Sequence, residues 1–75
     1  MTKLPVVSGQ RCVRALKQVG FRVDRQRGSH IILVRDDPDS TLSVPNHKEL
    51  RPGTLKSILR QAGLSVDEFI ALLKD

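Results

Sequence analysis

A tight turn at residues 27–28, an Arg-Gly pair between two segments of strand character, most constrains how this chain can fold. Residues 21–26 alternate apolar and polar side chains at their start, and residues 30–35 are rich in β-branched side chains. We therefore predict an antiparallel hairpin. Residues 36–40 have the composition of a loop, and residues 41–45 are expected to form a short third strand.

Segments with apolar residues at helical spacing precede and follow the predicted strands in the sequence. Before the sheet, Ser8 has the position of an N-cap, and Gly20 is expected to close the helix. After the sheet, a second helix is expected to begin at Pro52 and to close at Gly63. A third helix follows Ser65, which has the spacing of a capping box with a glutamate three residues later.

The predicted order of elements defines the fold class. It is an α+β fold of α-β-β-β-α order, with a three-stranded antiparallel sheet, helices packed on one face and a short extra C-terminal helix. We expect one domain over residues 1–75. This layout suits recognition of an RNA backbone by shape, as in double-stranded RNA-binding domains. The layout is also common among proteins that bind no nucleic acid.

Positive charge is concentrated in the first half of the chain. The first 35 residues carry eight Lys and Arg side chains and one acidic side chain, whereas the remainder carries five basic and seven acidic ones. Most of this basic excess is arginine, whose guanidinium group binds phosphate in a bidentate manner. We therefore predict RNA contacts for Arg14 and Lys17 on the first helix and for Arg25 and Arg27 on the hairpin.

The composition also excludes several classes of function. The chain has no Trp or Tyr, so stacking of unpaired bases on aromatic side chains is not expected. The apolar run at residues 31–34 is far too short to span a membrane. The chain has a single cysteine, Cys12, which lies on the predicted apolar stripe of the first helix. Because there is only one cysteine and no secretory leader is recognised, we expect a cytoplasmic protein. Metal-ligand spacing is absent, and no metal or other cofactor is expected.

His30 is the candidate catalytic residue, because it follows the turn and has several arginines close in sequence. RNA supplies its own nucleophile, the 2′-hydroxyl, so strand cleavage needs a base, an acid and cations near the phosphate. Histidine can exchange protons near neutral pH. A structural histidine held by hydrogen bonds at the turn is the alternative. His47 has the same two interpretations, with fewer basic residues around it.

Strand alternation predicts which neighbours share a face with this histidine. If His30 faces solvent, Ile32 and Val34 lie on the same face of the sheet. An exposed apolar strip of this kind usually marks a protein interface. We therefore hypothesise that a partner protein contacts Ile32 and Val34 and blocks the histidine.

Several segments, in order along the chain, resemble the HicA toxin family, also described as YcfA-like mRNA interferases of type II toxin-antitoxin systems. The matching segments are Lys3-x-Pro5 followed by Ser8-Gly9, Leu16-x-x-x-Gly20-Phe21, Gly28-Ser29-His30, Val44-Pro45-x-His47, Gly53-Thr54-Leu55-x-x-Ile58-Leu59, and Ala62-Gly63-Leu64-Ser65 leading to Phe69. Each segment alone is weak, whereas the ordered set covers nearly the whole chain and is specific.

The resemblance implies a fold like that of double-stranded RNA-binding domains, ribosome-independent cleavage of messenger RNA and neutralisation by a HicB-like antitoxin. In that family the histidine of the Gly-Ser-His motif is catalytic, which corresponds to His30. The resemblance also implies that Gly28 lets RNA approach the turn and that Ser29 has a supporting role. The leading hypothesis is a metal-independent toxin endoribonuclease. A non-catalytic double-stranded-RNA-binding module and a small protein-interaction domain remain alternatives.

Overall fold

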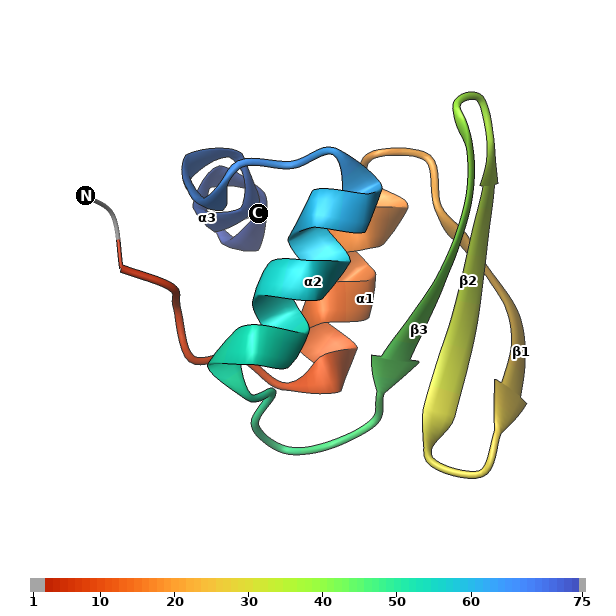
Figure 1. Cartoon of the computed structure of the whole chain (residues 1–75), viewed down its shortest axis with the longest axis horizontal. Coiled ribbons are helices and arrows are strands. Elements are labelled where there is room, and N and C mark those ends of the chain that lie inside the picture. Colours follow the sequence, from red (N-terminus) through yellow and green to blue (C-terminus); the bar gives the residue numbers. More distant parts are fainter. Residues whose placement is uncertain (1–2, 75) are drawn as a thin grey trace.

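The computed structural model, which describes residues 3–74, has the predicted order of elements (Figure 1). The elements are α1 (Gly9–Lys17), β1 (Arg22–Arg27), β2 (His30–Asp36), β3 (Asp39–Pro45), α2 (Pro52–Ala62) and α3 (Val66–Leu73). The three strands form one antiparallel sheet in the order β1-β2-β3. The predicted α+β fold is confirmed.

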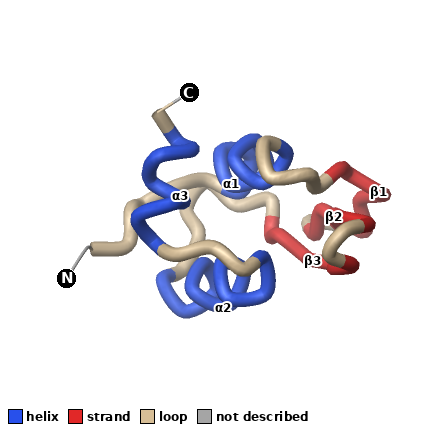
Figure 2. The backbone as a smooth tube through the Cα atoms, turned by 90° about the horizontal axis from the view of Figure 1, so that it is seen from above, coloured by secondary structure: helices blue, strands red, loops and turns tan. Residues whose placement is uncertain are grey.

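The helices lie together on one side of the sheet, and the other side is left uncovered (Figure 1). Both α1 and α2 contact β3, and α3 contacts α1. The edge strand β1 lies farthest from the helices (Figure 2), and all six of its residues are exposed. The sheet therefore presents an open outer face that ends in a fully exposed edge strand.

One cluster of buried side chains joins the two layers. The inner face of β2 and β3 supplies Ile31, Leu33, Leu42 and Val44, which pack with apolar side chains of the helices. Cys12 is fully buried in this cluster, and burial raises the pKa of its thiol to about 12. Both observations fit the predicted position of Cys12 on the apolar stripe of the first helix and a packing role for its side chain. Within residues 3–74, no helix has the length and apolar character needed to cross a membrane.

The predicted helix caps are present. The Ser8 hydroxyl oxygen accepts a hydrogen bond from the backbone N–H of Arg11 at 3.1 Å. The Ser65 hydroxyl accepts one from the N–H of Glu68 at 3.1 Å, and the Glu68 carboxylate accepts one from the N–H of Ser65 at 2.8 Å. This second bond lowers the pKa of Glu68. Gly63 ends α2 in the left-handed conformation, with φ at 77°.

The boundaries differ from the prediction at the two hairpin turns. The first turn consists of Gly28 and Ser29 and not of residues 27–28, because Arg27 is the last residue of β1 and pairs with His30. Residues 36–40 are not a loop, because β2 continues to Asp36, β3 begins at Asp39, and these two residues pair across the strands. Only two residues, Asp37 and Pro38, form the connecting turn, a position that Asp and Pro favour. Gly20 closes the first helix as predicted. After Lys17 the chain makes one further turn with Gly20 at a φ of 98°, and the backbone N–H of Phe21 donates to the carbonyl oxygen of Leu16 at 3.2 Å.

Candidate active site

Three segments that are distant in sequence meet at one end of the molecule: the β1–β2 turn, the loop after β3 and the N-terminus of α1. The backbone N–H of Asn46 donates to the carbonyl oxygen of Ser29 at 2.6 Å, and the N–H of Gly9 donates to that of His47 at 2.9 Å. The side-chain amide of Gln10 donates to the Asn46 side-chain oxygen at 3.0 Å. These bonds hold the turn that carries the candidate histidine.

His30 is the first residue of β2, and its side chain is exposed. Its cross-strand partners are Arg27 in β1 and Pro45 in β3. The next residue, Ile31, is buried, so His30 belongs to the outer face of the sheet. No hydrogen bond to the His30 side chain is found among residues 3–74. The imidazole is therefore accessible to a ligand that lies on the outer face.

Gly28 gives the turn before His30 its shape. Its φ is +59°, a left-handed conformation that side chains with a Cβ rarely adopt. A Cβ added to Gly28 would meet no atom within 4 Å, so the backbone conformation, and not crowding inside the protein, accounts for this glycine. The side-chain amide of Gln26 donates to the Gly28 carbonyl oxygen at 3.1 Å and closes the turn.

Three arginines of β1 line up on the same outer face, and we call them the arginine row: Arg22, Arg25 and Arg27. Their cross-strand partners in β2 are Val34, Ile32 and His30, respectively. Regular alternation would place the first two arginines on opposite faces, because they are three residues apart. An irregularity in register at Asp24 adds one residue to β1 and brings them to the same face. Sequence reasoning missed this bulge.

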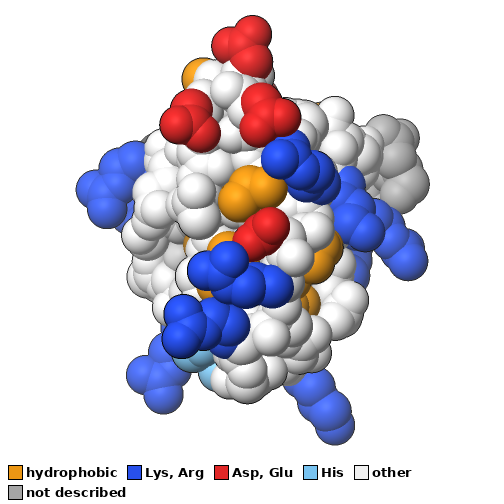
Figure 3. Space-filling view, turned by 90° about the vertical axis from the view of Figure 1, so that its right-hand side faces the viewer, with side chains coloured by type: hydrophobic (Ala, Val, Ile, Leu, Met, Phe, Trp, Pro, Cys, Tyr) orange, Lys and Arg blue, Asp and Glu red, His pale blue; other side chains and the backbone are white. Residues whose placement is uncertain are grey.

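Carboxylates pair with two members of the arginine row. Arg22 contacts Asp36 at 3.0 Å, and Arg25 contacts Asp24 at 2.8 Å. Arg27, opposite His30, has no ion pair within the part of the chain that the structure describes. Figure 3 shows this uneven distribution: acidic side chains gather at the tip formed by the β2–β3 turn, and Lys and Arg gather toward the opposite end with a histidine.

The predicted apolar strip lies on the same face. Ile32 and Val34 are half-buried, whereas their neighbours Ile31 and Leu33 are buried in the core. The alternation therefore places Ile32 and Val34 on the outer face, beside the arginine row and in line with His30.

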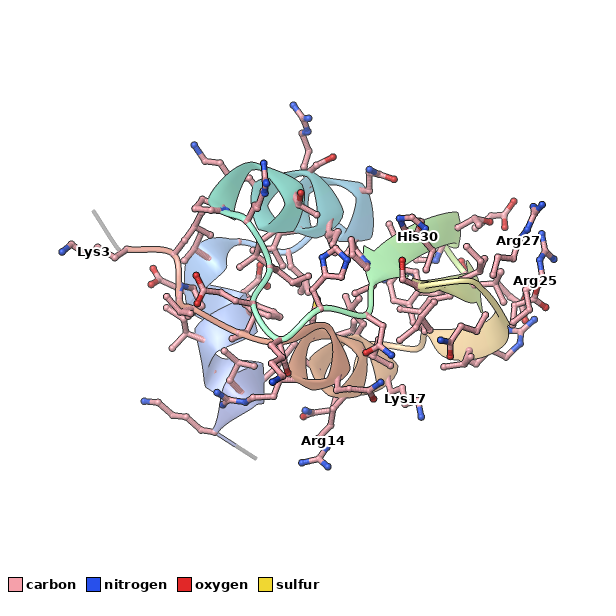
Figure 4. The ribbon with its side chains drawn as sticks, turned by 90° about the horizontal axis from the view of Figure 1, so that it is seen from below. Lys3, Arg14, Lys17, Arg25, Arg27 and His30 are labelled. Atoms are coloured by element: carbon pink, nitrogen blue, oxygen red, sulfur yellow. The ribbon has the colours of Figure 1, made fainter. Side chains whose placement is uncertain are left out.

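The basic residues of α1 form a separate surface. Arg14 and Lys17 are exposed, but they project from the far side of α1, away from His30, Arg25 and Arg27 (Figure 4). A shallow hollow of about 250 Å³ lies along α1. The hollow is lined by Gln10, Arg11, Val13, Arg14 and Lys17. The four predicted RNA-binding side chains therefore do not converge on one site.

His47 lies at the same end of the molecule as His30. It follows Pro45, the cross-strand partner of His30, by two residues, and its side chain is exposed. In the sequence, the Val44-Pro45-x-His47 segment had already indicated this histidine as a candidate. No group of three or more His, Cys, Asp or Glu side chains that could hold a metal ion occurs within residues 3–74.

The family model described as HicA toxin of bacterial toxin-antitoxin matches residues 9–64. The chain belongs to the HicA toxin family. The match covers more than half of the chain and runs from the start of α1 to just beyond α2, so the HicA region contains His30, His47 and the arginine row. A comparison with curated proteins finds no match.

Proposed function

We propose that this HicA-family protein is a toxin endoribonuclease, which cleaves messenger RNA and inhibits translation until an antitoxin binds it. The observation that carries the proposal is the position of His30. Its side chain is exposed on the uncovered face of the sheet, directly opposite Arg27 at the end of the arginine row. The match to a family of toxins supports the same conclusion.

The proposed reaction uses the nucleophile that RNA carries. Arg27, with Arg25 beside it, binds the phosphate, and the imidazole of His30 removes the proton of the adjacent 2′-hydroxyl. The 2′-oxygen then attacks phosphorus, the bond to the 5′-oxygen breaks, and that oxygen takes up a proton. The products are a 2′,3′-cyclic phosphate and a 5′-hydroxyl end. The guanidinium groups stabilise the negative charge that develops on the phosphate oxygens.

Other residues at this end position the reacting groups. Gly28 permits the turn conformation, and Ser29 supports it through the bond between its carbonyl oxygen and Asn46. The proton for the leaving 5′-oxygen comes from the imidazolium of His30 or from His47, the candidate acid at the same end. No step requires a metal ion or another cofactor.

Cleavage in the presence of a chelator tests the proposed function. Purified protein is incubated with a structured messenger RNA in EDTA or in Mg²⁺, and the ends of the fragments are analysed. We expect cleavage rates that agree within about two-fold, because arginine and histidine side chains supply the charge stabilisation and proton transfer. The expected fragments carry 5′-hydroxyl ends. Absence of cleavage, or cleavage only with Mg²⁺, would contradict the proposal.

We further propose that the partner is a HicB-like antitoxin that covers the outer face of the sheet. Replacing Ile32 and Val34 together by threonine is expected to weaken the complex about 10-fold or more, because it replaces apolar surface with hydroxyl groups. The fold should persist, since both side chains are half-buried and threonine favours strands. Affinity is measured by calorimetry with a purified HicB-like antitoxin.

Val6→Thr is the control for this experiment, because Val6 is a β-branched apolar residue, 71% exposed, outside the sheet. We expect this variant to bind as the wild type does. Equal affinity of the Ile32/Val34 double variant and the wild type would show that the antitoxin binds elsewhere.

A non-catalytic RNA-binding module is the second candidate function. The observation that favours it is the separate basic surface of α1, where Arg14 and Lys17 project away from His30 (Figure 4). Such a module would bind RNA through this helix and would not depend on His30. In the endoribonuclease proposal, Arg14 and Lys17 contact a different segment of the RNA from the one at His30.

A further inference from the structure

The arginine row is partly neutralised by the protein itself. Asp36 accepts two hydrogen bonds from the guanidinium of Arg22, at 3.0 and 3.4 Å, and Asp24 accepts one from Arg25 at 2.8 Å. The geometry at Arg22 is the two-pronged arrangement in which arginine binds either a carboxylate or a phosphate. The third member of the row, Arg27, is the cross-strand partner of His30.

We propose that Asp24 and Asp36 occupy phosphate-binding positions of the arginine row in the free protein and are displaced when RNA binds. This inference rests on the proposed function, because it assigns a role to residues around the same site. RNA phosphate first contacts Arg27, the member of the row without a carboxylate partner among residues 3–74. The first contact is therefore made opposite His30.

The exposure of these ion pairs makes the exchange feasible. The side chains of Arg22 and Asp36 are 59% and 82% exposed, and those of Arg25 and Asp24 are 60% and 43% exposed. Ion pairs in contact with water are weak, and a competing anion can replace the carboxylate without opening the core. The pairs hold the arginine side chains on the outer face while keeping them from binding phosphate strongly.

The bulge in β1 and the short β2–β3 turn create this arrangement. The bulge brings Arg22 and Arg25 to one face and leaves Asp24 next to Arg25. The turn is only two residues long, so Asp36 remains a strand residue, two positions beyond Val34 and on the same face as Arg22. A loop over residues 36–40, as the composition suggested, would not have fixed Asp36 in this position.

The experiment compares Asp36→Asn and Asp24→Asn with Asp37→Asn, all in a His30→Ala background so that the RNA stays intact. Asp37 is the matched control, because it lies in the adjacent turn, its change removes the same charge, and no ion pair to it is found in the described residues. Binding of a fluorescein-labelled single-stranded RNA is followed by anisotropy over a range of KCl concentrations.

We expect Asp36→Asn and Asp24→Asn each to raise RNA affinity about three-fold or more at low salt. Each should also steepen the slope of log affinity against log salt by about 0.7, the value for one added phosphate contact on a single strand. Asp37→Asn should change affinity less than about two-fold and leave the slope unchanged, because it frees no guanidinium group.

Two other results would overturn the inference and have different meanings. If the three variants agree in affinity and slope, the carboxylates act only through overall charge, and the proposed function stands. If the His30→Ala parent shows no salt-dependent RNA binding, the RNA-directed function fails and the inference fails with it.

Discussion

Gly9→Ala is expected to destabilise the protein by about 3 kcal/mol and to remove most of its RNA-cleaving activity. Gly9 is the first residue of α1 and is buried. A Cβ added there would overlap the carbonyl oxygen of Pro45 and would lie 3.1 Å from the Cα of Asn46. These are backbone atoms, which cannot rotate away as a side chain would. Either α1 or the loop after β3 must therefore move.

This displacement would reach the candidate active site. Pro45 is the cross-strand partner of His30, and the N–H of Gly9 donates to the carbonyl oxygen of His47. A shift between α1 and this loop therefore weakens the bonds that hold the turn before His30. The fractional loss of cleavage activity should therefore be larger than the fraction of protein molecules that are unfolded.

Urea unfolding followed by circular dichroism measures the loss of stability, with Gly53→Ala as the control. Gly53 lies in the first turn of α2, where an added Cβ would meet no atom within 4 Å. We expect Gly53→Ala to be neutral or to stabilise the protein by about 0.5–1 kcal/mol, because alanine favours the helix. Equal stability of Gly9→Ala and the wild type would show that α1 and the loop are not in close contact.

The parts of the fold that were predictable from the sequence depend on local signals. Ser8 and Ser65 bond to backbone N–H groups three residues later, so their positions in the sequence were sufficient to locate two helix starts. The turn at Gly28 and the end of α2 at Gly63 both require positive φ, which glycine supplies. The alternation that places Ile32 beside His30 on one face is also local.

The parts that were missed depend on contacts between distant residues. The bulge at Asp24 is defined by how β1 pairs with β2, and the sequence of β1 carries no separate signal for it. The link from Gln10 to Asn46 joins residues 36 positions apart. The direction of Arg14 depends on how α1 is rotated against the sheet, so charge alone could not separate it from Arg27.

His30→Ala is expected to lower the rate of RNA cleavage by about 10²–10⁴-fold, the usual contribution of a general acid-base residue. The effect should be on catalysis, because His30 is exposed and its removal opens no cavity in the core. RNA affinity should stay within about three-fold of the wild type, since the guanidinium of Arg27 remains. His47→Ala, at the same end of the molecule, should lose less activity.

The most direct test of the account is the single-turnover cleavage rate of a structured messenger RNA in EDTA, for wild type, His30→Ala and His47→Ala. Circular dichroism must first show that all three are folded. We predict cleavage by the wild type, at least a 100-fold lower rate for His30→Ala, and RNA binding by all three proteins. Equal rates for wild type and folded His30→Ala would contradict the assignment of His30, and RNA binding without cleavage by the wild type would favour the non-catalytic module.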